Sequence, residues 1–217
     1  FDDIIQLAIR FLAEDANYAE ARHWKFKDLF VDEFQDVNPL QFALLQAWLG
    51  SSSSLTVVGD PCQAIYSWNG ADARFLNDFE KYFPNSQTVI LKDNFRSSPE
   101  ILALSSSILP MMEHLDSKKQ SGRLPTIRAE LDEYEEARSV ARLVKELAVG
   151  DIDLGDQAVL VRTHAQIPPI IEVFKEREIK FMVASDAESG AGRDDGVQIL
   201  TLHAAKGLEW KIVHLCG

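Results

Sequence analysis

Short runs of apolar residues alternate along the chain with stretches in which apolar residues recur every three or four positions. The runs are mostly Val, Ile and Leu without polar residues between them, which is typical of parallel strands that are covered on both faces. They predict strands at Leu29–Val31, Leu55–Val58, Thr88–Leu91, Ala158–Arg162, Phe181–Ala184, Val197–Leu202 and Ile212–Leu215. The helical spacing predicts helices over residues 40–48 and 137–148, and Pro99 is well placed to begin a third helix that ends near Leu109. This alternation predicts an α/β fold built on parallel sheets.

Two carboxylates directly follow the first predicted strand. The sequence DEFQD occupies residues 32–36, so Asp32 and Glu33 lie at the carboxyl end of the strand, where α/β proteins bind ligands. One carboxylate there can hold Mg²⁺ against nucleotide phosphates, and its neighbour can orient or deprotonate an attacking water. A strand that ends in acidic residues is also common at a solvated sheet edge, so this motif alone leaves both interpretations open.

An unusual loop follows the second predicted strand, with the sequence GDPCQAIYSWNGA at residues 59–71. Gln63 is a neutral side chain that can contact a phosphate from the neighbouring sheet edge. Tyr66 and Trp68 are separated by one residue, so both reach one site only from an irregular or extended loop. Exposed aromatic side chains in such a loop suit stacking against bases, whereas a buried pair that packs the loop is the alternative.

The composition is that of a globular protein, with 46% hydrophobic and 26% charged residues among 217. The formal net charge of −12 disfavours a broad basic surface for nucleic acid or for an anionic membrane, although base stacking needs no net positive charge. The two cysteines, Cys62 and Cys216, are too few for a disulfide framework and indicate reduced thiols. No apolar run approaches the ~18 residues of a membrane span and no signal peptide opens the chain, so we expect a cytoplasmic protein without a membrane partner.

Four motifs resemble, in order, those of the superfamily 1 DNA helicases of the UvrD/Rep/PcrA type. The sequence DEFQD at 32–36 is similar to the family's second motif, and the loop at 59–71 is similar to its third. The sequence NFRS at 94–97 is similar to the fourth motif, and TLHAAKGLEW at 201–210 is similar to the fifth. The opening residues FDDI at 1–4 also match the family's lead-in to the second motif. Four ordered motifs over nearly the whole chain are far more specific than DEFQD alone.

The resemblance implies the P-loop NTPase architecture, with two incomplete tandem RecA-like domains. Residues 1–88 would form the C-terminal part of the first domain, which holds the second and third motifs. Residues 89–217 would form an incomplete second domain, which holds the fourth and fifth motifs. The family usually inserts a large mobile subdomain between those last two motifs, whereas this sequence has only a short linker at residues 185–196. The insertion would then be missing from this branch or have been removed from this chain.

The resemblance also implies ATP and Mg²⁺ as cofactors. Asp32 would hold Mg²⁺, Glu33 would be the base for the hydrolytic water, and Gln63 would contact the γ-phosphate and couple the nucleotide to the DNA loop. Arg96 would be an arginine finger that stabilises the charge developing on the transferred phosphoryl group, with a surface ion pair as its alternative. The further nucleotide-binding residues would be Phe95, Gly207 and Glu209. Phe95 stands where the family usually has Tyr, and its ring can still stack on adenine.

Single-stranded DNA is the partner that the resemblance implies for the loop at 59–71. Trp68 would stack on a base with Tyr66 beside it, and Asn69 would belong to the same contact although the family usually has Arg there. His203 in the fifth motif would touch the strand, with a core or capping histidine as its alternative. Junctions between single- and double-stranded DNA, and DNA-repair proteins, are further expected partners.

The sequence also departs from the family pattern. It has no phosphate-binding GxxxxGK[ST] loop, and the sixth motif would lie beyond Gly217, so we expect a piece cut at both ends that is inactive by itself. The whole protein would be an ATP-dependent helicase that moves 3′ to 5′ on single strands and unwinds duplex DNA in repair or recombination. A non-catalytic helicase-like module of a repair complex, or the helicase part of a helicase–nuclease, are the alternatives.

Overall fold

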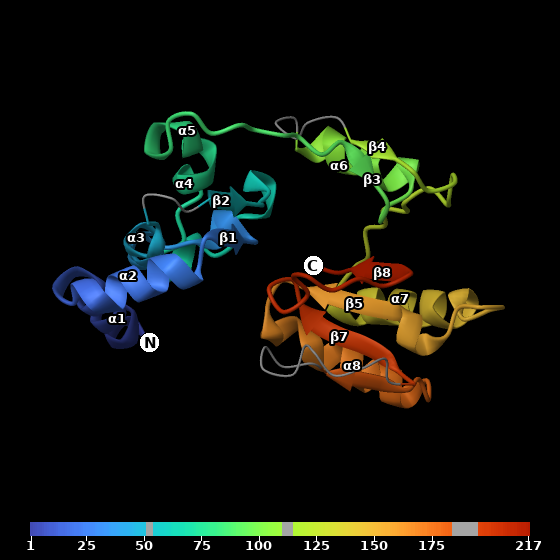
Figure 1. The fold of residues 1–217 in the computed structure, drawn as a ribbon. Coiled ribbons are helices and arrows are strands. Elements are labelled where there is room, and N and C mark those ends of the chain that lie inside the picture. The colour runs from blue at the N-terminus through green and yellow to red at the C-terminus, as the bar shows by residue number, and fades with distance from the viewer. Residues whose placement is uncertain (51–53, 110–114, 184–194) are drawn as a thin grey trace. The chain divides into compact units, whose positions relative to one another are not determined.

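The computed structural model of the protein describes residues 1–50, 54–109, 115–183 and 195–217 (Figure 1). The chain divides into two compact units, Phe1–Pro125 and Thr126–Gly217, and each is described by itself. The helices are α1 (Asp2–Glu14), α2 (Ala16–Lys25), α3 (Pro39–Trp48), α4 (Arg74–Asn77), α5 (Phe79–Tyr82), α6 (Pro99–Ile108), α7 (Glu133–Leu147) and α8 (Ile167–Glu176). The strands are β1 (Asp28–Val31), β2 (Ser54–Val57), β3 (Asp93–Asn94), β4 (Asp116–Ser117), β5 (Gln157–Val161), β6 (Phe181–Val183), β7 (Val197–Thr201) and β8 (Ile212–Leu215).

A two-stranded parallel sheet organises the first part of the chain. β1 and β2 pair over their full lengths, from Asp28 opposite Ser54 to Val31 opposite Val57. A buried aromatic cluster lies against the sheet, in which the rings of Phe42 and Phe75 stack with centroids 4.1 Å apart. The apolar face of α3 belongs to this cluster, and burying such a face is what stabilises a helix of only ten residues. The core therefore fixes the carboxyl ends of β1 and β2 side by side.

One predicted strand, Thr88–Leu91, is wrong. The structure gives this segment no regular secondary structure, and Val89 and Leu91 are 79% and 76% exposed. The next strand begins only at Asp93, where β3 pairs in parallel with β4. A Val/Ile/Leu run has a high strand propensity, but that propensity reflects packing against neighbours, and no described segment pairs with this one.

The second unit is a four-stranded parallel sheet in the order β6-β7-β5-β8. Every residue of β5 is buried, as expected for a central strand that is covered on both faces. Helices α7 and α8 pack their apolar residues against one face of the sheet, and Phe174 is among the fully buried side chains there. The chain after β7, from Leu202 to Trp210, packs against the other face. The segment that resembles the fifth motif is thus part of this unit's core.

The sequence-based elements of both units agree with the structure, apart from Thr88–Leu91. The strands expected at residues 29–31, 55–58, 158–162, 181–184, 197–202 and 212–215 are β1, β2, β5, β6, β7 and β8, within a residue or two at the ends. The α/β class with parallel sheets is therefore confirmed. The division into domains 1–88 and 89–217 stays a prediction, and most of the expected linker 185–196 lies outside the described residues. No helix in the described part of the chain has the length and apolar character that crossing a bilayer requires.

A buried polar pair links β5 to β8 within the second unit. The side-chain amide of Gln157 donates to the Val144 carbonyl oxygen at 3.0 Å, and its Oε1 lies 3.1 Å from His214 Nε2. Because Oε1 can only accept, His214 Nε2 carries a proton. Burial lowers the pKa of His214 to about 4, well below that of a solvent-exposed histidine.

Protonation of His214 is expected to destabilise the second unit. The unfolded chain takes up this proton near the usual histidine pKa of about 6.5, whereas the folded chain takes it up only near pH 4. The free energy of unfolding should be insensitive to this residue above that range and fall as the pH decreases from about 6.5 to 4, by at most about 1.4 kcal/mol per pH unit. Urea unfolding at stepped pH, followed by a probe in the second unit, measures this slope. His214→Gln keeps a donor for Gln157 and should flatten the slope, and an unchanged slope would contradict the assignment.

Candidate functional site

Two polar loops meet at the carboxyl edge of the β1–β2 sheet. Asp32 and Glu33 directly follow β1, and Asp60 lies three residues beyond the end of β2. The backbone continues the pairing past the strands, because Val58 N donates to Val31 O at 2.8 Å and Phe34 N donates to Val58 O at 2.9 Å. The prediction that Asp32 and Glu33 lie at a parallel-sheet edge is therefore confirmed, whereas their chemical roles stay predictions.

Glu33 occupies a backbone conformation that is uncommon for a residue with a side chain. Its φ is +52°, in the left-handed region, and a 3₁₀ turn, Phe34–Asp36, begins directly after it. The Glu33 N–H donates to Asp32 Oδ1 at 2.8 Å. Such backbone strain of about 1–3 kcal/mol persists where the surrounding structure enforces it, and it is frequent at functional sites. The turn keeps both carboxylates exposed at the edge of the sheet.

Gln35 joins the two loops, and the sequence analysis assigned it no role. Its side chain is fully buried, with 0% exposed. Its Nε2 donates to Glu33 Oε2 at 2.5 Å, and its Oε1 accepts from the backbone N–H of Asp60 at 3.0 Å. The sequence contains one signal for this role, because Gln35 is a long polar residue between Phe34 and α3. A polar side chain that is buried at such a position needs hydrogen-bond partners.

Asp60 organises the loop that contains Gln63. One carboxylate oxygen, Oδ1, accepts from Cys62 N at 2.9 Å, and the other, Oδ2, accepts from Gln63 Nε2 at 2.9 Å. Burial and the neighbouring Asp60 carboxylate raise the pKa of the Cys62 thiol, so Cys62 is not an activated nucleophile. Gln63 therefore lies at the same sheet edge as Asp32 and Glu33, as the sequence suggested.

Tyr66 and Trp68 lie next to each other on an irregular loop. Their ring centroids are 6.3 Å apart with an interplanar angle of 65°, an edge-to-face arrangement. Trp68 is 72% exposed, and Asn69 shares its 3₁₀ turn, Ser67–Asn69. Gly70 ends the turn with φ +84°, a conformation that glycine adopts without a steric penalty. A buried packing role is therefore excluded for Trp68.

The fourth motif is organised by the side chain of Asn94. Its Oδ1 accepts from the backbone N–H groups of Arg96 at 3.1 Å and Ser97 at 2.8 Å, which forms a tight turn at the end of β3. The turn leaves Phe95 and Arg96 exposed. Ser117 on β4 also donates through its hydroxyl to the Ser97 carbonyl at 2.7 Å.

Glu100 holds the segment after β4 against α6. Its carboxylate accepts hydrogen bonds from the Ser121 hydroxyl and, at 2.9 Å, from the Gly122 N–H. These bonds favour the charged form and lower the pKa of Glu100 to about 2. The Glu100 carboxylate therefore has a structural role. It holds Ser121 and Gly122 against the start of α6, the helix that follows the fourth motif.

The fifth motif turns sharply at the carboxyl end of β7. Thr201 accepts from Ala204 N through its hydroxyl at 3.2 Å and from Ala205 N through its carbonyl at 3.0 Å. His203 is half-buried, and Glu209 is exposed. Gly207 is exposed too, with φ +82°. The three predicted residues thus lie on one short segment whose apolar neighbours are anchored in the core.

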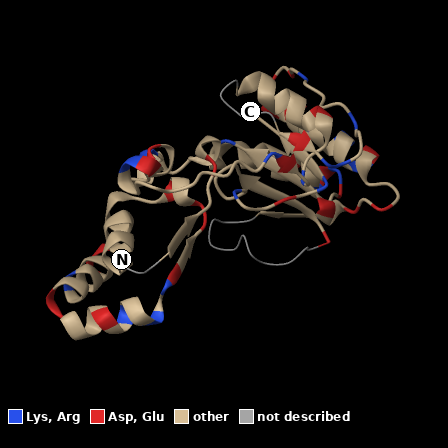
Figure 2. Ribbon diagram, turned by 45° about the horizontal axis from the view of Figure 1, so that its top comes forward, with Lys and Arg blue, Asp and Glu red and all other residues tan. Residues whose placement is uncertain are grey.

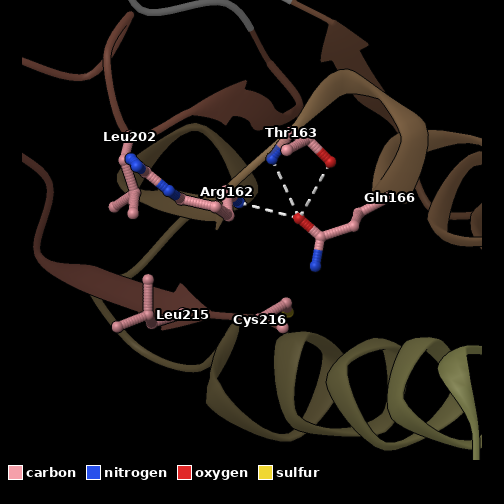
Figure 3. A pocket seen from close by; sticks show the side chains of 7 residues that line it. Arg162, Thr163, Gln166, Leu202, Leu215 and Cys216 are labelled. Atoms are coloured by element: carbon pink, nitrogen blue, oxygen red, sulfur yellow. Dashed lines mark hydrogen bonds between the residues drawn. The ribbon is translucent and has the colours of Figure 1, made fainter.

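An open cleft of about 530 Å³ lies at the carboxyl edge of the second unit's sheet (Figure 3). It is lined by Arg162, Thr163, Gln166, Leu202, Leu215, Cys216 and Gly217. Gln166 Oε1 accepts from the backbone N–H groups of Arg162 and Thr163 at 2.9 Å each, which closes the end of β5. This cleft has no signature in the sequence, because three separate strand ends contribute to its lining.

The predicted residues form four separate groups, three in the first unit and one in the second. Asp32, Glu33 and Gln63 share one sheet edge, and Tyr66, Trp68 and Asn69 share the following loop. Phe95 and Arg96 occupy the turn after β3, whereas His203, Gly207 and Glu209 lie in the second unit. Acidic and basic residues are interspersed over the described part of both units (Figure 2). In that part of the chain, no cluster of three or more His, Cys, Asp or Glu residues is arranged to hold a metal ion.

Comparison with known proteins connects these groups to one family. Residues 1–84 match the UvrD/REP helicase N-terminal domain, and residues 89–189 match the UvrD-like helicase C-terminal domain. The chain is 34% identical over 200 residues to the ATP-dependent DNA helicase UvrD2 of Mycobacterium tuberculosis, a match of 88% of this chain and 28% of that protein. It is 32% identical over 196 residues to UvrD1 of the same species, with 84% and 25% covered. It is 31% identical over 189 residues to the ATP-dependent DNA helicase Rep of Buchnera aphidicola, with 84% and 28% covered. The chain thus spans about a quarter of the length of each of these relatives.

Proposed function

Because the chain belongs to the UvrD/Rep family of helicases, we propose that it forms part of an ATP-dependent DNA helicase that moves 3′ to 5′ on single strands. Residues 1–88 would contribute to a first RecA-like domain and residues 89–217 to a second. Three relatives are named ATP-dependent DNA helicases, which supports this proposal. The hydrogen-bonded edge that joins Glu33, Gln35, Asp60 and Gln63 is the observation on which it rests.

In this proposal Glu33 removes a proton from the water that attacks the γ-phosphate. Its carboxylate is exposed at the carboxyl edge of a parallel sheet, where nucleotides bind in α/β proteins. Gln63 lies at the same edge and would contact the γ-phosphate through its neutral amide. Arg96, exposed on its turn, would stabilise the negative charge that develops on the phosphoryl group. Phe95 would stack on the adenine, and Gly207 and Glu209 would contact the nucleotide from the fifth motif.

Asp32 is the residue that would hold Mg²⁺. Its carboxylate is exposed, and one of its oxygens already accepts from the backbone N–H of Glu33 at 2.8 Å, which fixes its orientation. Carboxylate oxygen is the ligand type that Mg²⁺ prefers, and one or two carboxylates with substrate phosphates complete such sites in proteins. The chemistry of the donor therefore fits. When bound, Mg²⁺ would neutralise part of the phosphate charge.

DNA would be held by the loop at residues 59–71 and by the fifth motif. The exposed Trp68 ring suits stacking on a base, with Tyr66 supporting it edge-on. Asn69 in the same turn can add a neutral hydrogen bond, and His203 would reach the strand from the second unit. Stacking tolerates any base, which suits a motor that moves along DNA irrespective of sequence. The role in DNA repair or recombination belongs to this proposal as well.

The full-length gene product tests the proposal directly. We expect single-stranded DNA to stimulate its ATP hydrolysis, and we expect it to separate duplexes that have a 3′ single-stranded tail but not those with only a 5′ tail. Strand displacement with labelled oligonucleotides and a phosphate-release assay measure both properties. DNA binding without stimulated ATP hydrolysis would favour the non-catalytic module instead. Unwinding only from 5′ tails would contradict the proposed direction.

A further inference from the structure

We propose that Gln35 is a positioning residue that holds the Glu33 carboxylate in its working orientation and connects it to the loop of Asp60 and Gln63. This inference rests on the proposed function, in which Glu33 activates the water. Gln35 would not touch the nucleotide. It would act by fixing the direction in which Glu33 accepts a proton, and by making that direction depend on the position of the neighbouring loop.

The chemistry of its two partners fixes the orientation of the Gln35 amide. Nε2 lies 2.5 Å from Glu33 Oε2, and Oε1 lies 3.0 Å from the Asp60 backbone nitrogen. An ionised carboxylate can only accept and a backbone N–H can only donate, so the reversed amide would oppose like groups at both ends. A single side chain therefore satisfies one group from each loop, and neither loop can shift alone without breaking a bond.

Burial makes these two bonds costly to lose. Gln35 is fully buried, so the loss of either partner leaves a buried polar group without a hydrogen bond and destabilises the folded unit. The side of Gln35 that faces the loop of Asp60 is also tightly packed. A Cβ atom added at Gly59 would lie 2.6 Å from Gln35 Oε1 and 2.9 Å from a methyl carbon of Leu76. Gly59 is thus the residue that lets the second loop approach Gln35 closely enough for the bond to Asp60.

The connection continues through Asp60 to the residue expected to contact the γ-phosphate. Gln63 Nε2 donates to Asp60 Oδ2 at 2.9 Å, so Glu33, Gln35, Asp60 and Gln63 form one hydrogen-bonded series. Tyr66 and Trp68 follow Gln63 within five residues on the same loop. A change in the conformation of that loop on DNA binding would therefore be transmitted to Glu33 through Gln35. In this way DNA binding would alter the rate of ATP hydrolysis.

Variants of the full-length gene product separate positioning from packing. Gln35→Met keeps the length of the side chain and fills the same space, but it removes both hydrogen bonds. We expect the DNA-stimulated kcat for ATP hydrolysis to fall about tenfold, because Glu33 loses the charge-assisted bond that orients it, while KM for ATP changes less than about twofold. Gln157→Met is the matched control, because Gln157 is also fully buried and hydrogen-bonded but lies in the second unit. It should reduce stability without lowering kcat per folded molecule.

Gln35→Glu provides a pH-dependent test of the same bond. Its side chain can still accept from the Asp60 N–H, but when ionised it repels the Glu33 carboxylate. Protonation restores a donor toward Glu33, so the ratio of variant to parent kcat should rise at least about threefold as the pH falls from 8 to 6, since a buried carboxyl group beside a second carboxylate keeps its proton to a higher pH than a free one. A merely structural role would leave this ratio independent of pH.

The outcomes distinguish this inference from the proposed function. If Glu33→Gln lowers hydrolysis but Gln35→Met leaves kcat within twofold of the parent, the positioning role is wrong and the base assignment stands. If Glu33→Gln itself leaves hydrolysis intact, the proposed role of Glu33 is wrong. Should Gln35→Met fail to fold, the pH dependence of Gln35→Glu decides, and a flat ratio would overturn the inference.

Discussion

Glu33→Gln is expected to lower ATP hydrolysis by the full-length gene product by about 10²–10⁴-fold, the range in which a general base contributes to catalysis. The amide has nearly the shape of the carboxylate but cannot accept the proton of the attacking water. Nucleotide affinity should change little, because in the proposed mechanism Glu33 acts on the water rather than on the phosphates. Phosphate release measures the first effect, and binding of a fluorescent ATP analogue measures the second.

Two features make this substitution informative. Glu33 is exposed at the sheet edge, so replacing it leaves the buried aromatic cluster beneath it intact. Glu20→Gln is a suitable control, because Glu20 is an exposed carboxylate on α2, outside the proposed site. Hydrolysis within threefold of the parent in Glu33→Gln would show that another group activates the water.

Trp68→Ala is expected to weaken the binding of single-stranded DNA by about 5–150-fold, which corresponds to the 1–3 kcal/mol of one stacked base. Unwinding should fall at least as strongly, because the loop that we propose to bind DNA also contains Gln63. Trp68→Phe should recover part of the affinity, since a smaller ring still stacks. Fluorescence anisotropy with a labelled oligothymidine at fixed salt concentration measures the affinity.

The chain offers a closely matched control for this experiment. Trp24 on α2 is 75% exposed, compared with 72% for Trp68, and it lies outside the loop at residues 59–71. Trp24→Ala removes the same side chain from a surface to which we assign no DNA contact, so its affinity should remain that of the parent. Equal losses of DNA affinity in both variants would indicate that DNA binds to any exposed indole ring. That result would contradict a specific role of Trp68.

The strands and the two acidic loops could be predicted because their signals are local. The apolar run Leu29–Val31 that ends in DEFQD marks both the strand and the polar edge where it stops. The expected cover on both faces is wrong for β1, because its residues alternate between exposed and half-buried and Phe30 is 77% exposed. The same local signal failed at Thr88–Leu91, because strand formation also needs a partner, which composition does not reveal. Exposure of Trp68 likewise required the structure, since sequence alone fitted a packed pair equally well.

The role of Gln35 could not be predicted because it depends on a contact between distant residues. Its partner Asp60 lies 25 positions away in the sequence, and the contact arises only when β1 and β2 pair in this register. The cleft of the second unit was missed for a similar reason, because three strand ends contribute to it. Side chains that act through tertiary contacts leave little trace in periodicity or composition.

The fifth motif has a consequence for how this protein can change during evolution. Its Leu202, Leu208 and Trp210 cover one face of the second sheet, whereas His203 and Glu209 alternate with them along the same segment. Selection for a stable core and selection for the proposed ligand contacts would therefore act on adjacent positions of one short segment. A substitution that weakens the packing of the apolar residues also displaces the polar ones. Substitutions should therefore accumulate slowly in this segment, even at positions that contact no ligand.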